Sequence, residues 1–238
     1  CADWKPLAGV SVSLNFMFLA LKDFESKGRP MGDSVASKNF KHNMVILADR
    51  LIYEYVSEKW RGSSDSKIAN NISKFSELGE QFTEQSEASW KKLIVGINDD
   101  FQIEAKDVSF GASKVLVYHI YAINGINGPG RSVQVDMDHI IPQAKFKSAS
   151  SINTSTQNAL FNLSPLPMSE NRKKSKRALA DIKDEESWLI AEIEKYTTID
   201  KKDFKKYSNA LNWKDLQTKR RKIYEITFFK GRKEQFNN

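Results

Sequence analysis

Apolar residues recur at helical spacing through most of the first half of the chain. The first such segment covers residues 9–27 and ends before Gly28-Arg29-Pro30, and its apolar positions are Val10, Leu14, Phe18, Leu21 and Phe24. The same spacing predicts further helices over residues 36–60, 66–77 and 88–98. Residues 112–123 are apolar enough for either a helix or a buried strand, and their length does not decide between the two. We therefore expect a mainly helical region over residues 1–123.

The pattern changes at residues 124–130, where three glycines and one proline predict a loop. Apolar and polar residues then alternate over 133–138, as in a half-buried strand. A long polar loop over 143–158, a short strand over 160–163 and a helix over about 170–182 complete a ββα unit. Two or three helices are predicted after residue 184. We therefore expect an α+β fold, in which helices surround a ββα core over 124–183 and basic helices follow over 184–238.

Positive charge is concentrated near the end of the sequence. The whole chain has a formal charge of +7, whereas residues 201–238 hold twelve Lys or Arg against four Asp or Glu. Such a surplus favours a polyanionic partner such as nucleic acid. The run Lys219-Arg220-Arg221-Lys222 suits contact with a DNA backbone, and a solvated helix face is an almost equal alternative.

The only cysteine is Cys1, so the chain can form no internal disulfide and no zinc site built from cysteines. This usage fits a reducing, cytoplasmic location. A run of about 18 apolar residues is absent, so we expect no membrane span. The opening Cys1-Ala2-Asp3-Trp4 has neither an initiator Met nor a signal pattern. We interpret it as an internal boundary of a longer protein, and a processed N-terminus is the alternative.

Four polar residues between positions 138 and 171 have the chemistry for phosphodiester hydrolysis. Asp138 and His139 are adjacent at the end of the first predicted strand, Asn162 lies on the second strand, and Asn171 lies at the start of the helix. Histidine has an ordinary pKa that suits a general base near neutral pH. Carboxylate and amide oxygens suit Mg²⁺, which keeps several waters and needs few protein ligands. A metal ion held in this way stabilises the charge that develops on a leaving oxygen.

The run Asp136-Met137-Asp138-His139-Ile140-Ile141-Pro142-Gln143 resembles the first motif of the HNH, or His-Me finger, nucleases. Asn162 and the run Asn171-Arg172-Lys173-Lys174-Ser175 resemble the rest of that motif. The pattern is very similar to the HNH domain of the CRISPR RNA-guided nucleases, with a longer loop after the histidine. The resemblance implies that the ββα core is a ββα-metal finger, and that the chain is a metal-dependent endonuclease that nicks DNA.

The same resemblance implies a role for each residue of the motif. His139 is the expected general base, and Asp138 and Asn171 are the expected metal ligands. Asn162 is expected to support the finger loop and orient the histidine, with Asp136 as a nearby supporting carboxylate. Asn171 stands where many HNH enzymes have a third histidine, and an amide is a poorer ligand for softer metals. We therefore expect Mg²⁺ or Mn²⁺ as the working ion rather than zinc or nickel.

The segment Asn158-Ala159-Leu160-Phe161-Asn162-Leu163-Ser164-Pro165-Leu166 is similar to the C-terminal nuclease domain of GmrSD-type restriction enzymes. A weaker similarity to that group covers most of the chain. Those enzymes carry an N-terminal NTP-hydrolysing domain and act in defence against phage. The Asp-Gly-Gln-Gln-Arg signature of that domain does not occur here. The resemblance thus implies a partner domain, with its NTP site, that is missing from this chain.

Five basic residues follow on the helix expected at Asn171, namely Arg172, Lys173, Lys174, Lys176 and Arg177. We predict that they contact phosphate beside the scissile bond, and a solvated helix face is the alternative. His119 lies in an apolar run, so we expect it to be a core residue. We also expect four tryptophans in the core, namely Trp60, Trp90, Trp188 and Trp213.

The leading hypothesis is an endonuclease that acts on double-stranded DNA as the nuclease part of a restriction or antiviral defence protein. The alternative from another class is a DNA-binding or regulatory module whose finger is catalytically silent within a larger NTP-dependent protein. An RNA-directed or toxin-like nuclease would share the same site residues and differ only in its substrate.

Overall fold

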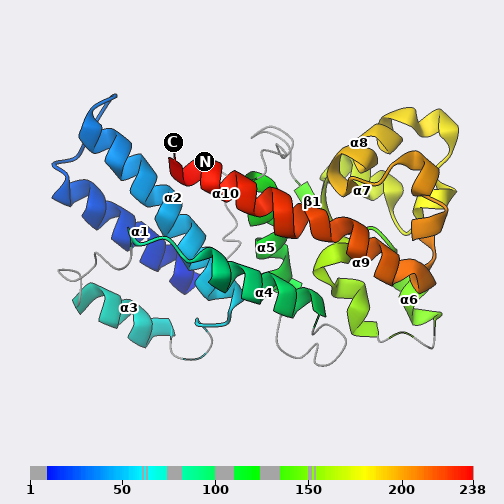
Figure 1. The fold of residues 1–238 in the computed structure, drawn as a ribbon, viewed down its shortest axis with the longest axis horizontal. Coiled ribbons are helices and arrows are strands. Elements are labelled where there is room, and N and C mark those ends of the chain that lie inside the picture. Colours follow the sequence, from blue (N-terminus) through cyan, green and yellow to red (C-terminus); the bar gives the residue numbers. More distant parts are fainter. Residues whose placement is uncertain are drawn as a thin grey trace. The chain divides into compact units, whose positions relative to one another are not determined.

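The computed structural model describes residues 10–60, 62, 64–73, 82–99, 110–123, 135–149, 152 and 154–237, and Figure 1 shows their elements in chain order. The chain divides into two compact units. The first comprises Cys1–Lys91 together with Arg232–Asn238, and the second comprises Lys92–Gly231. All of the site residues expected from the sequence therefore belong to the second unit.

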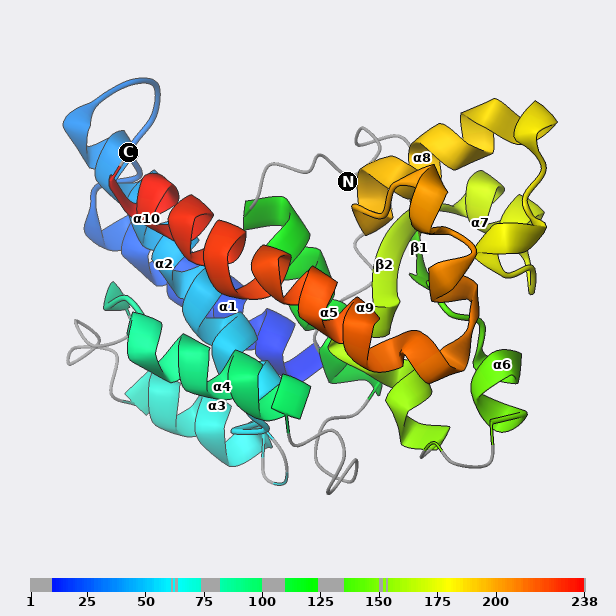
Figure 2. The same cartoon turned by 45° about the vertical axis from the view of Figure 1, so that its right-hand side comes forward.

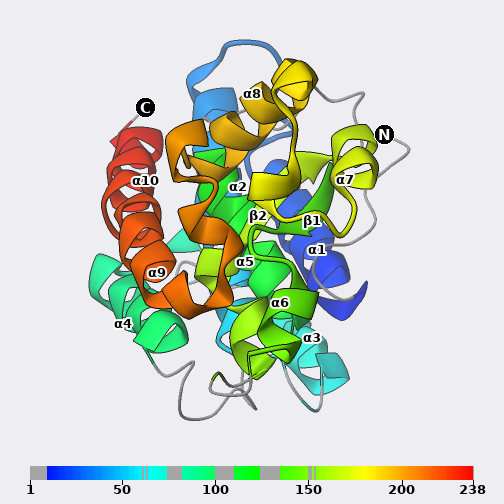
Figure 3. The same cartoon turned by 90° about the vertical axis from the view of Figure 1, so that its right-hand side faces the viewer.

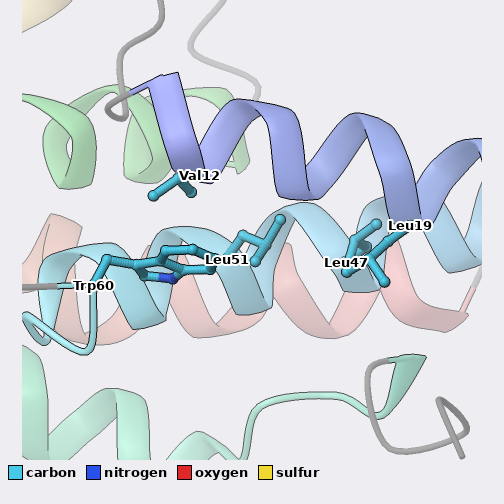
Figure 4. Close-up of a cluster of buried hydrophobic side chains, with 5 residues drawn as sticks. All are labelled: Val12, Leu19, Leu47, Leu51 and Trp60. Atoms are coloured by element: carbon cyan, nitrogen blue, oxygen red, sulfur yellow. The ribbon is translucent and has the colours of Figure 1, made fainter. Parts of the chain in front are cut away.

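The first unit is built from helices that pack along an apolar seam. Its helices are α1 (Val10–Ser26), α2 (Val35–Val56), α3 (Ser64–Ser73) and the start of α4 (Glu87–Asp99). The Ser34 hydroxyl caps α2 by accepting a hydrogen bond from the Ser37 amide at 3.1 Å. Helices α1 and α2 lie side by side, and the buried cluster shown in Figure 4 consists of Val12, Leu19, Leu47, Leu51 and Trp60. The four helices predicted in this part of the chain are confirmed, with shifted ends.

The apolar positions whose spacing predicts α1 are mostly not its buried positions. Val10, Leu14 and Leu21 are 66%, 53% and 55% exposed, whereas the buried residues are Val12, Asn15, Leu19 and Asp23. The buried side includes polar contacts, because Asn71 donates to the Asn15 amide oxygen at 2.8 Å and Asn43 donates to Asp23 Oδ1 at 2.9 Å. Apolar residues occur on several sides of this helix, so the spacing predicts a helix without selecting the side that packs.

The second unit contains both strands found among the described residues. Helix α5 (Phe110–Ile123) decides the helix-or-strand alternative in favour of a helix. Strand β1 (Val135–His139) lies where the first strand was predicted, although the loop predicted over 124–130 and the first two strand residues lie outside the described residues. The predicted long loop instead contains helix α6 (Gln143–Lys147) and the 3-10 helix Thr154–Asn158. Strand β2 (Leu163–Pro167) pairs with β1, as Figure 2 shows.

Strand β2 begins at Leu163, which is the last residue of the strand predicted over 160–163. Residues Leu160–Asn162 form a 3-10 helix, and β2 continues through Pro165 to Pro167, which we had expected to lie outside the strand. The pairing is antiparallel, with Pro165 opposite Met137 and Pro167 opposite Val135. Every second residue of an antiparallel strand directs its N–H away from the partner strand, and a proline is tolerated there. The prolines therefore fit the strand because they alternate with the residues that bond to β1.

Helix α7 (Met168–Lys174) follows β2 directly and is shorter than predicted. It ends because Ser175 has a φ of 52°, in the left-handed region that a continuing helix does not adopt. A short 3-10 turn over Leu179–Asp181 lies in the rest of the segment where a helix was predicted, and a second one over Asp184–Glu186 follows that segment. The prediction that Lys176 and Arg177 lie on this helix is therefore wrong.

The end of the chain contains three α-helices, as predicted. They are α8 (Ser187–Thr197), α9 (Trp213–Lys222) and α10 (Phe228–Asn237). A π-helical turn over Ile223–Thr227 joins α9 to α10, and 3-10 turns between α8 and α9 cover Lys201–Asp203, Lys206–Ser208 and Ala210–Asn212. Helix α8 packs against β2, and α9 packs against the 3-10 helix Leu160–Asn162. These helices therefore support the strand and turn that carry part of the expected site.

The described protein is mostly helical with one two-stranded antiparallel sheet, in agreement with an α+β class. No helix in the described ranges is both long enough and apolar enough to cross a membrane. The division of the chain after residues 123 and 183 stays a prediction.

The buried residues confirm most of the expected core. His119 is 9% exposed and its ring meets Phe228 edge-on at 5.7 Å between centroids. Trp60, Trp90 and Trp213 are buried, but Trp188 is 42% exposed, so the expectation for Trp188 is wrong. Helical spacing predicts that Trp188 packs. The spacing does not show that other side chains of α8 already form its buried face.

Candidate active site

Strand β1 carries two carboxylates on one face, and helix α7 carries their partners. Asp136 and Asp138 are two residues apart on a strand, so their side chains leave the same face. Asn171 and Lys174 are three residues apart on α7 and share one side of that helix. Asn171 Nδ2 donates to Asp136 Oδ2 at 3.3 Å, and Lys174 Nζ lies 3.0 Å from each carboxylate oxygen of Asp138. Two polar pairs therefore connect α7 to β1. These two elements contact each other, and Figure 3 shows them on the side that faces the viewer.

The Lys174–Asp138 pair is buried. Lys174 is 1% exposed and Asp138 is 6% exposed. Burial raises the pKa of the Asp138 carboxyl, and the Lys174 ammonium acts in the opposite direction. Lys174 Nζ also donates to the carbonyl oxygen of His139 at 3.0 Å. Lys174 thus supplies the positive charge beside Asp138, and this buried position does not fit the phosphate contact predicted for it.

The imidazole of His139 is held by two amide side chains from the segment that follows it. His139 Nε2 lies 2.9 Å from Asn158 Oδ1 and 3.2 Å from Gln143 Nε2, and Gln143 Nε2 donates to Asn158 Oδ1 at 3.3 Å. Asn158 Oδ1 accepts a hydrogen bond from His139 only when Nε2 carries the proton. In that tautomer Nδ1 is the basic nitrogen of the ring. Asn158 thus orients His139 in this tautomer. Gln143 Nε2 is itself a donor, so in this tautomer it supports the ring through its hydrogen bond to Asn158 and not through one to Nε2.

The surroundings of His139 favour its neutral form. Burial is the largest influence and lowers the pKa of the imidazole, whereas the hydrogen bond to Asn158 and the charge of Asp138 raise it. The positive charges of Lys174 and Lys114 lower it further. Because the net shift of the pKa is downward, the neutral imidazole that a general base requires is the main form at neutral pH.

Asn162 joins the segment after His139 to the start of β2. Its side chain is fully buried, and its Oδ1 accepts from the Ile141 amide at 2.8 Å while its Nδ2 donates to the Ile141 carbonyl at 3.0 Å. Nδ2 also donates to the Gln157 carbonyl at 2.8 Å, and the Ile140 amide donates to the Asn162 carbonyl at 2.9 Å. These bonds satisfy both ends of the amide and fix the backbone directly after His139. The supporting role predicted for Asn162 requires contacts of this kind.

The donor chemistry beside α7 suits a hard cation. Asp138, Asp136 and the Asn171 amide offer oxygen ligands of the type that Mg²⁺ prefers. The buried ammonium of Lys174 beside Asp138 shows that this position favours positive charge. No group of three or more His, Cys, Asp or Glu side chains in the described ranges is placed to hold a metal ion. The predicted ligands are one carboxylate and one amide, which do not form a group of that kind, so this finding does not address them.

The five basic residues after Asn171 do not form one continuous surface. Lys174 is buried against Asp138, and Arg177 forms a two-point ion pair with Glu186 at 2.6 and 2.9 Å. Lys173 Nζ lies 4.1 Å from the centroid of the exposed Trp188 ring. The members that are exposed are Arg172, Lys173 and Lys176. A phosphate contact stays a prediction for these three.

The basic run on α9 is also divided between the surface and the interior. Arg220 is fully buried, Lys219 pairs with Asp203 at 2.7 Å, and Arg221 pairs with Glu225. The sequence shows four basic residues in a row but does not show that the second of them, Arg220, points inward. Any contact of this run with a DNA backbone therefore excludes Arg220.

Sequence reasoning missed three contacts of the site residues. Gln143 follows His139 by four residues, and Asn158 precedes Asn162 by four, yet both side chains converge on the imidazole. Lys174 follows Asn171 by three residues and pairs with Asp138. The spacing from Asn171 to Lys174 is a usable signal, because residues three apart on a helix share a side.

Comparison with protein-family models, with curated proteins and with solved structures finds no match for this chain. A function is therefore argued from the geometry and chemistry of the site.

Proposed function

We propose that this chain is a Mg²⁺- or Mn²⁺-dependent HNH endonuclease that nicks DNA, with β1, β2 and α7 as its ββα-metal finger. The observation that carries the proposal is the set of contacts made by Asn162. This one side chain holds both backbone groups of Ile141, while His139 ends β1 and α7 lies against the same strand. Such contacts hold the backbone beside His139 in place.

The chain's own residues supply a base, cation ligands and exposed positive charge. His139 accepts a proton at Nδ1 from the water that attacks phosphorus, and Asn158 holds the ring while it does so. Asp138 and Asn171 would hold the cation, and a bound Mg²⁺ or Mn²⁺ would supply Lewis-acid stabilisation of the leaving oxygen. Asp136 orients the Asn171 amide by accepting from its nitrogen, which leaves the amide oxygen for the cation.

The wider role that we propose is the nuclease part of a restriction or anti-phage defence protein acting in the cytoplasm. The support is the resemblance of the segment 158–166 to GmrSD-type nucleases, together with the basic surplus over 201–238. In that role a separate NTP-hydrolysing domain would couple nucleotide hydrolysis to cleavage.

One observation favours a second candidate, a DNA-binding module whose finger is catalytically silent. The ammonium of Lys174 already faces both oxygens of Asp138 in a buried position. A cation held by Asp138 would have to share the carboxylate with this ammonium or displace it. The two candidates differ in one measurable property, which is cation-dependent cleavage.

The experiment that separates them is the nicking of supercoiled plasmid by the purified chain with Mg²⁺ or Mn²⁺. A nuclease produces nicked circles that EDTA suppresses, and His139→Ala lowers that rate by roughly 10²- to 10⁴-fold while plasmid binding is retained. The matched control is His42→Ala, which removes a histidine of α2 in the first unit and leaves the nicking rate unchanged. Plasmid that is shifted but uncut supports the silent module. Equal nicking by His139→Ala and the parent protein contradicts the nuclease.

A further inference from the structure

Arg220 on α9 is a buried cation without an acidic partner among the residues that the structure describes. Its side chain is fully buried, and within the described part of the chain it contacts only neutral oxygens. Nη2 donates to the Leu163 carbonyl at 2.7 Å, Nε donates to the Phe161 carbonyl at 3.2 Å, and Nη1 donates to the Thr197 carbonyl. Two tyrosine hydroxyls complete the set, at 3.1 Å for Tyr121 and 2.7 Å for Tyr224. A charge in this position is costly unless each of its donors is satisfied.

The two strand-side acceptors of Arg220 flank a single residue of the candidate site. Phe161 and Leu163 precede and follow Asn162, so one guanidinium binds the carbonyl oxygens of the residues on both sides of it. The Tyr224 hydroxyl adds a hydrogen bond to the Leu160 carbonyl at 2.9 Å. The 3-10 turn Leu160–Asn162, which carries the Asn162 side chain, is therefore held in place by residues of α9 and of the π-helical turn that follows α9.

Hydrogen bonds and short stretches of backbone connect Arg220 to His139. Arg220 fixes the backbone around Asn162, and Asn162 in turn holds the amide of Ile140 and both backbone groups of Ile141. These are the first two residues after His139. Displacement of the Asn162 turn therefore displaces the backbone that sets the imidazole.

The contacts require arginine rather than another long side chain. A guanidinium presents five N–H donors in a rigid planar fork and can reach carbonyls on several segments at once. A lysine ammonium concentrates its donors on one atom, and a methionine has none. Apolar packing alone would be better served by a methionine or leucine, since neither brings a charge into the interior.

We infer that Arg220 is a positioning residue for the proposed cleavage reaction, acting on His139 through Asn162. The inference rests on the proposed nuclease function. It predicts that weakening the Arg220 contacts lowers the turnover of bound DNA, because a small displacement of a catalytic group costs up to about a hundredfold in rate. The affinity for DNA is unaffected, because Arg220 does not reach the surface.

The test compares Arg220→Lys with a matched control, Arg232→Lys. Arg232 is also buried, but it contacts Asp49 and the Gln85 carbonyl in the first unit. Tyr121→Phe serves as a milder second variant, because it removes one acceptor of Arg220 and keeps the charge. Each full-length protein is compared by circular dichroism, by kcat and KM for plasmid nicking, and by hydrogen exchange at the Ile140 and Ile141 amides.

The expected result for Arg220→Lys is a kcat lowered by about tenfold or more with KM within about twofold, together with faster exchange at Ile140 and Ile141. Tyr121→Phe shows the same pattern with a smaller change, and it carries the test if Arg220→Lys does not fold. Arg232→Lys loses stability but keeps kcat and the protection of both amides.

Unchanged exchange at these two amides in a folded Arg220→Lys or Tyr121→Phe variant overturns the inference, as does a kcat change no larger than that of Arg232→Lys. The exchange measurement does not depend on cleavage. If the parent protein binds plasmid without nicking it, the proposed nuclease function fails, and the positioning of Asn162 by Arg220 is still decided by the exchange rates.

Discussion

Each of the two compact units buries an arginine from the end of the chain, but the positive charge of the arginine is stabilised differently in each unit. In the first unit, Arg232 forms a two-point ion pair with Asp49, at 2.9 Å from Nε and 2.7 Å from Nη2. Trp90 Nε1 donates to the same carboxylate at 3.0 Å. In the second unit, Arg220 is surrounded by carbonyl and hydroxyl oxygens instead. The charge of Arg232 is paired with a carboxylate, whereas the charge of Arg220 is shared among neutral acceptors.

The difference teaches how each unit should respond to the loss of one partner. Removal of the carboxylate from a buried ion pair takes away the main compensation of the cation, and such a change is strongly destabilising. Removal of one acceptor among five leaves the other four in place, and the cost is that of a single hydrogen bond. The first arrangement concentrates stability in one residue, whereas the second distributes it and fixes backbone that lies beside the candidate site.

The largest effect is expected from Asp49→Ala in the first unit. Asp49 is 1% exposed and Arg232 is 4% exposed, so the variant leaves a guanidinium buried without its carboxylate. We expect the free energy of unfolding to fall by about 3–5 kcal/mol in urea denaturation. The double variant Asp49→Ala with Arg232→Met should recover part of that loss, since both charges are then absent. A loss under about 1 kcal/mol, as is usual for an exposed ion pair, would contradict the concentrated arrangement.

A smaller effect is expected from Tyr224→Phe in the second unit. The variant removes one acceptor of Arg220 and the hydroxyl that donates to the Leu160 carbonyl, while the other contacts of the guanidinium persist. We expect a loss of about 1–3 kcal/mol in the same denaturation experiment. Destabilisation equal to that of Asp49→Ala would show that the charge of Arg220 depends on one partner after all.

The smallest expected effect is a shift in the pH dependence of the cleavage rate, which depends on the protonation of His139 in the second unit. Burial lowers the pKa of His139 below its ordinary value of 6.5, and only the neutral ring accepts a proton. The nicking rate at saturating Mg²⁺ should therefore rise with pH through a midpoint below 6.5. In Asn158→Ala that midpoint should move further down, because the hydrogen bond to Asn158 raises the pKa. A midpoint above 6.5 in the parent protein would rule out His139 as a buried base.

The same shift has a consequence for stability, with a definite sign. The unfolded chain binds a proton at His139 more readily than the folded chain, so the stability supplied by this residue is complete above pH 6.5. It is lost as the pH falls from 6.5 through the lowered pKa.

Sequence reasoning predicted the helices and the order of strand, strand and helix, because these follow from spacing along the chain. It failed where the structure depends on contacts across the chain. The start of β2 was misplaced because Pro165 and Pro167 normally exclude a strand, and their tolerance depends on the register opposite Met137 and Val135. The end of α7 was misplaced because the turn at Ser175 carries no glycine signal.

The candidate site shows the same division. The roles expected from Asp136 to Asn171 came from residue chemistry together with the resemblance to HNH nucleases, and the contacts of Asn162 with Ile141 fit the role it was given. The partners of Asp138 and His139 were not foreseen, because Lys174 was read as a surface charge and Asn158 as loop. Whether a basic residue binds phosphate or pairs with a carboxylate depends on whether its side chain is buried. A local sequence pattern does not show this burial.

The prolines of β2 also affect whether strands of other molecules can pair with the edges of the small sheet. Of the three β2 residues that turn away from β1, Pro165 and Pro167 have no N–H group, and the N–H of Leu163 already bonds to the Leu160 carbonyl. On the outer side of β1, the Val135 carbonyl accepts from the Tyr118 hydroxyl at 3.1 Å and the His139 carbonyl accepts from Lys174. A strand from another molecule therefore finds few backbone groups to pair with at either edge. The sheet is thus protected against edge-to-edge aggregation in part by Lys174, which also pairs with Asp138 in the candidate site.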